Sequence, residues 1–184
     1  MTASQLDSFE RAYNKRLIKD FQTQLNRQAV QLDPDALKKR LTTFMEENCI
    51  CHLATCSEQI PRSTVLRYRS RDLSVYIFTE GGGKIHNIRA NSNVCITICG
   101  EYSGFESCTS LQAWGKAEII SPRQRETYSE IKEFFNLGER PDIKQTGITD
   151  IPDMFVIKIE LKQLRFLCFP EGILNQELTI TATD

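Results

Sequence analysis

Short runs of β-branched and apolar residues, separated by turn-forming residues, fill most of the chain after Cys49 and constrain its fold more than any other feature. Strands that follow one another so closely, without long crossover connections, pair antiparallel. A sheet built this way removes its exposed edges by closing into a small barrel. The predicted strands cover residues 49–56, 62–68, 73–79, 94–100 and 111–120, with a final pair at 154–161 and 164–169.

Helical periodicity marks the beginning of the chain. Apolar residues recur there at three- and four-residue steps and predict one helix with the stripe Leu6, Phe9, Tyr13, Leu17, Phe21 and Leu25. A second helix should start at Asp33 and Pro34, because Asp caps free amides and Pro fits the first helical position. Its buried stripe would be Leu37, Leu41, Phe44 and Met45. With further helices over 84–90 and 122–135, the sequence predicts an α+β fold around a six- to seven-stranded antiparallel barrel.

Composition narrows the class of protein. The 184 residues include 23 Lys and Arg against 24 Asp and Glu, and the net charge of −1 argues against a nucleic-acid binder. No apolar run approaches the ~18 residues of a membrane span, and the charged N-terminal stretch lacks the apolar core of a signal peptide. Seven cysteines cannot all pair within one chain, which predicts reduced thiols in a cytoplasmic protein.

The segment Phe78 to Lys84, which contains three consecutive glycines, is the most informative motif for chemistry. Glycines allow positive φ angles, so backbone amides can turn inward and form an anion-binding nest. The helix that follows offers unpaired N–H groups, and Lys84 adds a cation beside them. Phosphate is the expected occupant, although the spacing is not that of a Walker A loop. A flexible connection followed by a surface lysine remains the alternative.

Two arginines bound the predicted strand Arg62-Ser63-Thr64-Val65-Leu66-Arg67. Their spacing places Arg62 and Arg67 on opposite faces of the strand. One of them could bind a phosphate with two hydrogen bonds while the other faces a ring system or a substrate. The alternative is that both are solvated arginines at the ends of a strand.

The cysteines and histidines do not form a recognisable metal or catalytic motif. Cys49 and Cys51 would share one face of a strand while His52 points to the other, which is poor geometry for a metal. Buried cysteines as small apolar side chains are the better interpretation. With only His52 and His86 available, no Ser-His-Asp arrangement is convincing, and we identify no catalytic residue.

Taken together in their order and spacing, five segments resemble the pyridoxamine 5'-phosphate oxidase family across roughly residues 40–121. They are Arg62 to Arg67, Tyr76 to Thr79, Gly83 to Ile88 with Asn91, Val94 to Ile98, and Ser110 to Glu118. The resemblance implies an FMN-binding split barrel that forms a homodimer, with the flavin at the subunit interface. It implies three parts: an N-terminal helical extension packing on the barrel (1–47), the barrel itself (48–170) and a C-terminal tail (171–184).

The resemblance also implies which residues bind the cofactor. The strand Arg62, Ser63, Thr64, Val65, Leu66 and Arg67 would contact the phosphate and the isoalloxazine. Phe78 and Thr79 would correspond to the family's aromatic-threonine pair, with the Thr79 hydroxyl near the phosphate or the ribityl chain. Lys84 would bind the phosphate, and Ser110 would reach the flavin from the partner subunit. The chain departs from the oxidase at Gly83, where the oxidase has a second cation, and at Ser110, where it has a longer amide side chain.

A larger departure lies at the C-terminus, where the arginine- and tryptophan-rich segment of the true oxidase has no counterpart. Oxidation of vitamin B6 is therefore not expected. The resemblance implies instead an FMN-dependent oxidoreductase that transfers hydride or electrons through flavin N5 to a small-molecule substrate, with NADH or NADPH as candidate donor. The alternatives are a non-catalytic flavin or haem carrier or sensor, and a deazaflavin-dependent reductase. We expect no metal, nucleic acid or membrane as a partner.

Overall fold

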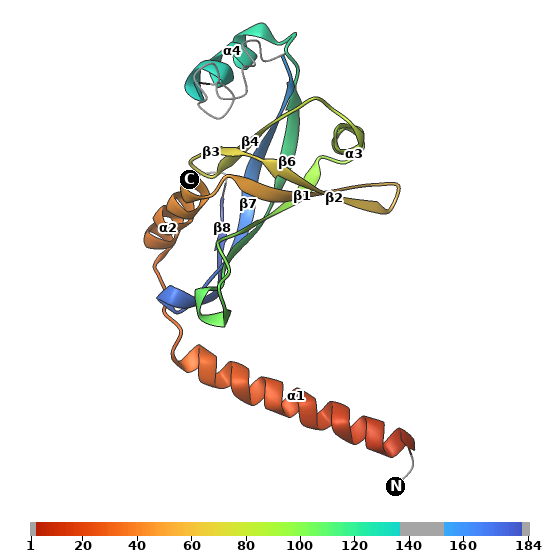
Figure 1. Cartoon of the computed structure of the whole chain (residues 1–184), viewed down its shortest axis with the longest axis vertical. Helices are drawn as coiled ribbons and strands as arrows, with labels where there is room; N and C mark the ends of the chain where they lie inside the picture. The colour runs from red at the N-terminus through yellow and green to blue at the C-terminus, as the bar shows by residue number, and fades with distance from the viewer. Residues whose placement is uncertain (1–2, 137–152, 182–184) are drawn as a thin grey trace.

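The computed structural model describes residues 3–136 and 153–181, in which eight strands form one curled antiparallel sheet (Figure 1). The strand order is β2-β1-β5-β6-β7-β4-β3, and β8 pairs with β7 beside this path. The predicted α+β split-barrel fold is confirmed, with one strand more than expected. The strands are β1 (Ile50–Ser57), β2 (Ile60–Arg67), β3 (Arg69–Arg71), β4 (Ser74–Thr79), β5 (Asn93–Cys99), β6 (Thr109–Ile120), β7 (Phe155–Cys168) and β8 (Ile173–Thr179).

Four α-helices accompany the sheet: α1 (Ala3–Arg27), α2 (Pro34–Glu47), α3 (Gly83–Ala90) and α4 (Arg125–Phe134). The predicted cap of α2 is present, since Asp33 Oδ1 accepts a 2.9 Å hydrogen bond from the Ala36 amide. Two short 3₁₀ turns complete the fold, η1 (Phe105–Ser107) and η3 (Phe169–Glu171). Figure 1 places α1 at one end of the molecule and α4 at the other.

The two N-terminal helices differ in their packing. The predicted stripe of α2 is buried and joins the main core against the sheet, through Leu37, Leu41, Phe44 and Met45. In α1 the stripe residues Tyr13, Leu17 and Phe21 are all about half exposed, at 55%, 49% and 53%. Figure 1 shows this helix extending away from the sheet. The division of the chain into 1–47, 48–170 and 171–184 stays a prediction.

The expected strand pair at 154–161 and 164–169 is wrong, because both runs belong to the single strand β7. The polar residues Lys162 and Gln163 suggested a turn. In the structure Trp114 pairs with Gln163 and Gly115 with Leu161, so Lys162 is the extra residue of a β-bulge. The bulge bends β6 and β7 together without interrupting either strand, and this bend helps the sheet to curl.

The segment expected as a tail contains a strand. After η3 and the left-handed residue Gly172, β8 runs antiparallel to β7. Gln176 of β8 forms two hydrogen bonds with the linker before α2. Its Nε2 donates to the Leu32 carbonyl at 2.6 Å, and its Oε1 accepts from the Leu32 amide at 3.1 Å. The polar, threonine-rich composition of this segment hid its strand character, because only one of its faces packs on the core.

All seven cysteines are free thiols, but their reactivity should differ. Cys51 is fully buried, and burial raises its pKa to about 12, whereas Cys49 and Cys99 are exposed. Since the thiolate is the reactive form, a short treatment with iodoacetamide at mildly alkaline pH should alkylate Cys49 and Cys99 and leave Cys51 unmodified. Peptide mass spectrometry measures this. All seven should react in denaturant, and rapid labelling of Cys51 in the folded protein would contradict its burial.

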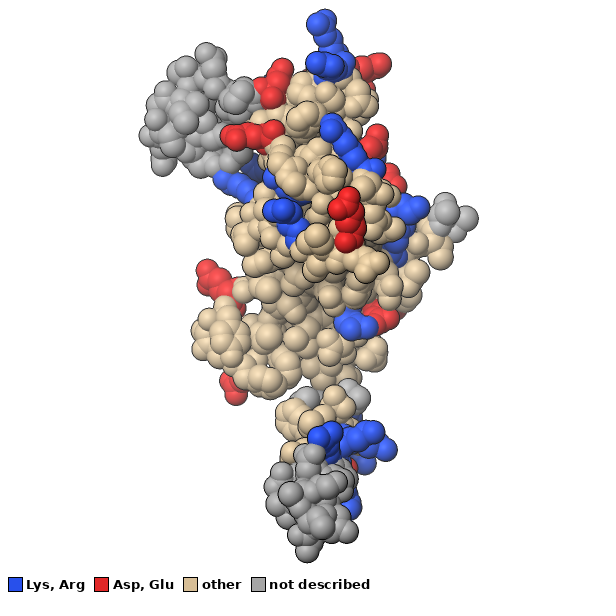
Figure 2. Space-filling view, turned by 90° about the vertical axis from the view of Figure 1, so that its right-hand side faces the viewer, with Lys and Arg blue, Asp and Glu red and all other residues tan. Residues whose placement is uncertain are grey.

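The surface carries charges of both signs. On the face shown in Figure 2, Lys and Arg side chains lie close to Asp and Glu side chains, in keeping with the near-zero net charge. Within the described residues, no helix combines the length and the apolar character that crossing a membrane requires.

Candidate functional site

The glycine loop connects β4 to α3, and two of its three glycines have the positive φ angles that the sequence suggests. Gly81 and Gly82 have φ angles of 131° and 89°, which side chains strongly disfavour. The first amide of α3 with a backbone acceptor is that of Ile85, which donates to the Gly82 carbonyl at 3.0 Å. The N–H groups of Gly83 and Lys84 precede it, at the positive end of the helix, where an anion is bound most readily.

Lys84 lies over this loop. Its Nζ donates a 2.6 Å hydrogen bond to the Gly81 carbonyl, and the side chain is only partly exposed. Burial of the ammonium group lowers the pKa of Lys84, the Arg62 guanidinium lowers it further, and the Glu80 carboxylate opposes both. Lys84 and Arg62 therefore lie close enough to interact electrostatically, and the Glu80 carboxylate lies beside them.

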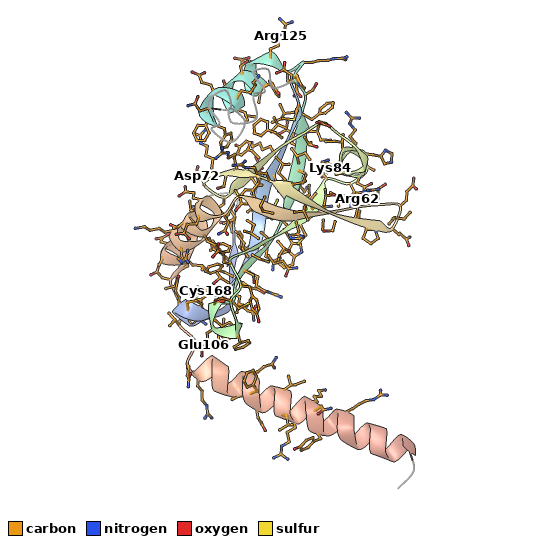
Figure 3. All side chains as sticks on the ribbon, in the orientation of Figure 1. Arg62, Asp72, Lys84, Glu106, Arg125 and Cys168 are labelled. Carbon is orange, nitrogen blue, oxygen red and sulfur yellow. The ribbon has the colours of Figure 1, made fainter. Side chains whose placement is uncertain are left out.

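Arg62 supplies the second charge. It pairs across the hairpin with Thr55 of β1, and its side chain reaches the start of α3. A Cβ built on Gly83 would lie 2.8 Å from the Arg62 Cζ atom, so the guanidinium rests directly on Gly83. Figure 3 shows Arg62 and Lys84 close together on the side of the sheet where β2 and α3 lie. Two separate elements, β2 and α3, thus place their cations at one loop.

Arg67 lies on the other face of β2, as its spacing from Arg62 predicts. It pairs with the exposed Ile50, whereas Arg62 pairs with the buried Thr55. The remaining residues of the strand alternate in the same way. Ser63 and Val65 are exposed, and Thr64 and Leu66 are half-buried toward the core. Within one chain, Arg62 is therefore the arginine that reaches the glycine loop.

A cavity of about 560 Å³ opens beside the loop. Two of its lining residues, Phe78 and Thr79, were predicted from the sequence, and the Thr79 Oγ1 accepts a 3.3 Å hydrogen bond from the Gly81 amide. Glu80 and Met154 also line it and were not predicted as site residues. Met154 could not have been found by motif, since it lies just before β7, far along the chain. The full lining is Phe78, Thr79, Glu80, Gly81, Gly82, Lys84 and Met154.

Ser110 is not brought to the loop within one chain. It lies at the start of β6, and β1 and β5 separate β6 from β2, a lateral distance of roughly 14 Å at the usual strand spacing. The pairing registers place Ser110 on the same face of the sheet as Arg67. Its contribution to a site in a partner subunit stays a prediction.

Two amide side chains hold α3 against β1, and the sequence did not predict these contacts. Asn87 Nδ2 donates to Thr55 Oγ1 at 3.1 Å, and both residues are buried. Asn91 Nδ2 donates to the Cys56 carbonyl at 3.4 Å. The available signal was a polar residue between Ile85 and Ile88, on a short helix where Asn is a poor former. Because Thr55 also pairs with Arg62, this contact links the helix to the strand that carries the second cation.

Asn87→Ala should destabilise the protein by about 1.5 kcal/mol, because it leaves the buried Thr55 hydroxyl without its partner. Thr55→Val should cost a similar amount, and the double variant should cost clearly less than the sum. Urea unfolding of the four proteins measures this coupling. Asn14→Ala, on the exposed surface of α1, is the matched control and should change stability little. Additive losses at 55 and 87 would mean that the bond is not formed.

Metal binding and histidine-based catalysis have less support in the described residues. No three His, Cys, Asp or Glu side chains of residues 3–136 and 153–181 come together as a metal site. His52 and His86 are both exposed and lie on different elements, β1 and α3. The loop with Arg62 and Lys84 is therefore the arrangement best suited to bind a ligand, and the ligand it suits is an anion.

Comparison with known proteins agrees with the split-barrel fold. The model of the pyridoxamine 5'-phosphate oxidase family matches residues 37–168. Among curated proteins none matches the sequence. General stress protein 26 from Bacillus anthracis str. Sterne has a similar solved structure, with a TM-score of 0.58 and 20% identity over 78% of this chain and 98% of that chain.

Two structures of lower sequence identity share the fold. One is a pyridoxinephosphate oxidase family protein from Clostridium acetobutylicum related to general stress protein 26, with a TM-score of 0.53 and 13% identity over 83% of this chain and 98% of that chain. The other is a heme binding protein from Mycobacterium smegmatis, with a TM-score of 0.58 and 14% identity over 83% of this chain and 60% of that chain. At these identities the structures establish the fold alone.

Proposed function

Because this chain belongs to the pyridoxamine 5'-phosphate oxidase family, we propose that it is an FMN-binding flavoprotein that acts as an oxidoreductase on a small molecule. The observation that supports this most is the meeting of Arg62 and Lys84 at the start of α3, beside two amides without helical acceptors. Such a set of donors suits a terminal phosphate.

Among the described residues, two cations, two free amides and an adjacent cavity support a phosphate-bearing cofactor at this loop. Lys84 and Arg62 would bind the phosphate together with the Gly83 and Lys84 amides, and the Thr79 hydroxyl lies at the same loop. The cavity lined by Phe78 and Met154 offers an apolar wall beside it. Bound flavin would supply hydride or electron transfer at N5, and the protein would orient the ring and tune its electronics.

A homodimer is part of the proposal. Arg67 and Ser110 share the outer face of the sheet, away from the loop of their own chain. That face also carries exposed apolar side chains, with Ile50 exposed at 46% and Val65 at 60%. A second copy would cover these side chains and would bring its Ser110 to the flavin of the first. The free cysteines suit a reducing cytoplasm.

The substrate would differ from that of the oxidase that gives the family its name. The described C-terminal residues form η3 and β8, and residues 169–184 include no Arg, Lys or Trp. A phosphorylated vitamin would find no cation in this segment. We therefore propose a small-molecule substrate without fixing its identity, and NADH or NADPH as donor.

The experiment is a titration of the purified protein with FMN, followed by flavin absorbance and fluorescence. Saturable binding of FMN, more weakly of riboflavin, is expected, and no flavin binding would overturn the proposal. Reduction of bound FMN by NADH or NADPH, with reoxidation by an added acceptor, would separate an enzyme from a carrier. A deazaflavin cofactor should compete for the same site, and tighter binding than FMN would identify the deazaflavin alternative.

Haem binding is the second candidate function. The heme binding protein from Mycobacterium smegmatis has the same fold, and His52 and His86 are exposed and available as iron ligands. Titration with haemin should then give a saturable Soret band that is lost in His52→Ala or His86→Ala. Both variants should leave FMN binding unchanged.

A further inference from the structure

The three glycines of the loop are required for different reasons. Gly81 and Gly82 have positive φ angles, and a Cβ built on either would meet no atom within 4 Å. Gly83 has an ordinary φ angle inside α3, so its backbone conformation does not demand glycine. A Cβ at Gly83 would instead lie 2.8 Å from the Arg62 Cζ, 2.9 Å from Nε and 3.0 Å from Nη2. At Gly83 the Arg62 guanidinium occupies the space that a side chain would need.

We propose that Gly83 is a positioning residue whose lack of a side chain forms a seat for the Arg62 guanidinium at the start of α3. The seat brings Arg62 beside Lys84 and so makes a two-cation site for a phosphomonoester dianion. This inference rests on the proposed function, and it adds the residue that positions Arg62 at the phosphate site.

Charge argues that the seat serves a ligand rather than the packing of the free protein. Arg62 approaches the positive end of a helix and the Lys84 ammonium group, both of which repel it, while the Glu80 carboxylate attracts Lys84 and offsets part of this repulsion. Within the described residues neither cation forms a salt bridge with a carboxylate. A bound anion would remove this repulsion. A terminal phosphate carries about −1.5 to −2 charges at neutral pH, which matches two cations better than a single charge would.

The surrounding structure holds the seat in place. Arg62 pairs with Thr55 across the β-hairpin, and the Thr55 hydroxyl accepts the hydrogen bond from Asn87, one helical turn after Gly83. The strand that carries the cation and the helix that receives it are therefore joined through one buried contact. The guanidinium reaches Gly83 from a fixed backbone, as preorganised phosphate recognition requires.

The test compares FMN with riboflavin, which differ only in the phosphate, for the wild type, Gly83→Ala, Arg62→Ala and the double variant. We expect Gly83→Ala to weaken FMN binding about tenfold, the effect of losing one charged hydrogen bond, and to leave riboflavin binding unchanged. In the Arg62→Ala background, Gly83→Ala should have no further effect on FMN. Gly100→Ala is the matched control, because its Cβ would meet no atom closer than 3.4 Å.

The Arg62 Nε–H resonance in ¹⁵N NMR spectra gives a second readout that needs no ligand; Arg62→Ala assigns it. Its chemical shift should change in Gly83→Ala. An unchanged resonance, or an equal loss of FMN affinity from Gly83→Ala with and without Arg62, would overturn the inference. If the wild type binds no flavin while the resonance still moves, the proposed function fails and the seat stands.

Discussion

Gly115→Ala should destabilise the protein by about 3 kcal/mol, a large loss for the addition of one methyl group. A Cβ at Gly115 would overlap the Glu160 carbonyl oxygen and lie 2.9 Å from the Glu160 carbonyl carbon and 3.1 Å from the Leu161 Cα. These are backbone atoms of β7, which pairs with β6 on one side and β4 on the other and cannot move aside alone. Overpacking against such a backbone lowers the free energy of unfolding.

Urea unfolding of Gly115→Ala and of the control Gly100→Ala measures the difference. Gly100 directly follows β5, and the nearest contact of its Cβ would be the Thr109 Cβ at 3.4 Å, an ordinary distance. The control should therefore change the free energy of unfolding by less than about 1 kcal/mol. Equal stability of the two variants would show that the β6–β7 bulge adjusts freely, and that the bend does not depend on glycine.

This bulge also explains why the sequence predicted two strands where the structure has the single strand β7. Alternating apolar residues and turn residues located most strands and the start of α2, because both signals are local. Lys162 and Gln163 are polar, as turn residues are, and only the pairing with Trp114 and Gly115 shows that they form a bulge. The local signal cannot separate a turn from a bulge, since the difference lies in the opposite strand.

The candidate site likewise has one part that the local sequence predicts and another that depends on tertiary contacts. The glycine loop and Lys84 are contiguous in sequence, so their geometry could be predicted from φ preferences and helix ends. The meeting of Arg62 with Gly83 depends on the β1–β2 hairpin and on the Thr55–Asn87 contact, which no local pattern encodes. Strand alternation did predict that Arg62 and Arg67 face opposite ways. It could not say which of them reaches the loop.

Lys84→Ala should weaken FMN binding by about 1.5–3 kcal/mol, or about 10- to 150-fold, because it removes a charge-assisted bond to phosphate. Riboflavin binding should not change. Lys84→Arg should retain most of the FMN affinity, since it keeps the charge at the loop. Fluorescence titration at fixed ionic strength measures both ligands. Lys38→Ala removes the same charge from an exposed position on α2 and controls for general electrostatics.

The pH dependence of FMN affinity also tests the role of Lys84, because it should change in a defined direction. In the proposed site Lys84 would bind phosphate as the ammonium ion, so affinity should be full below its pKa and should fall as the pH rises through it. Because burial and Arg62 lower that pKa, the fall should begin at a lower pH than an ordinary lysine would give. Lys84→Arg stays protonated and should remove this part of the profile. If FMN affinity falls equally with pH in both proteins, then the titrating group is not Lys84, and the phosphate lies elsewhere.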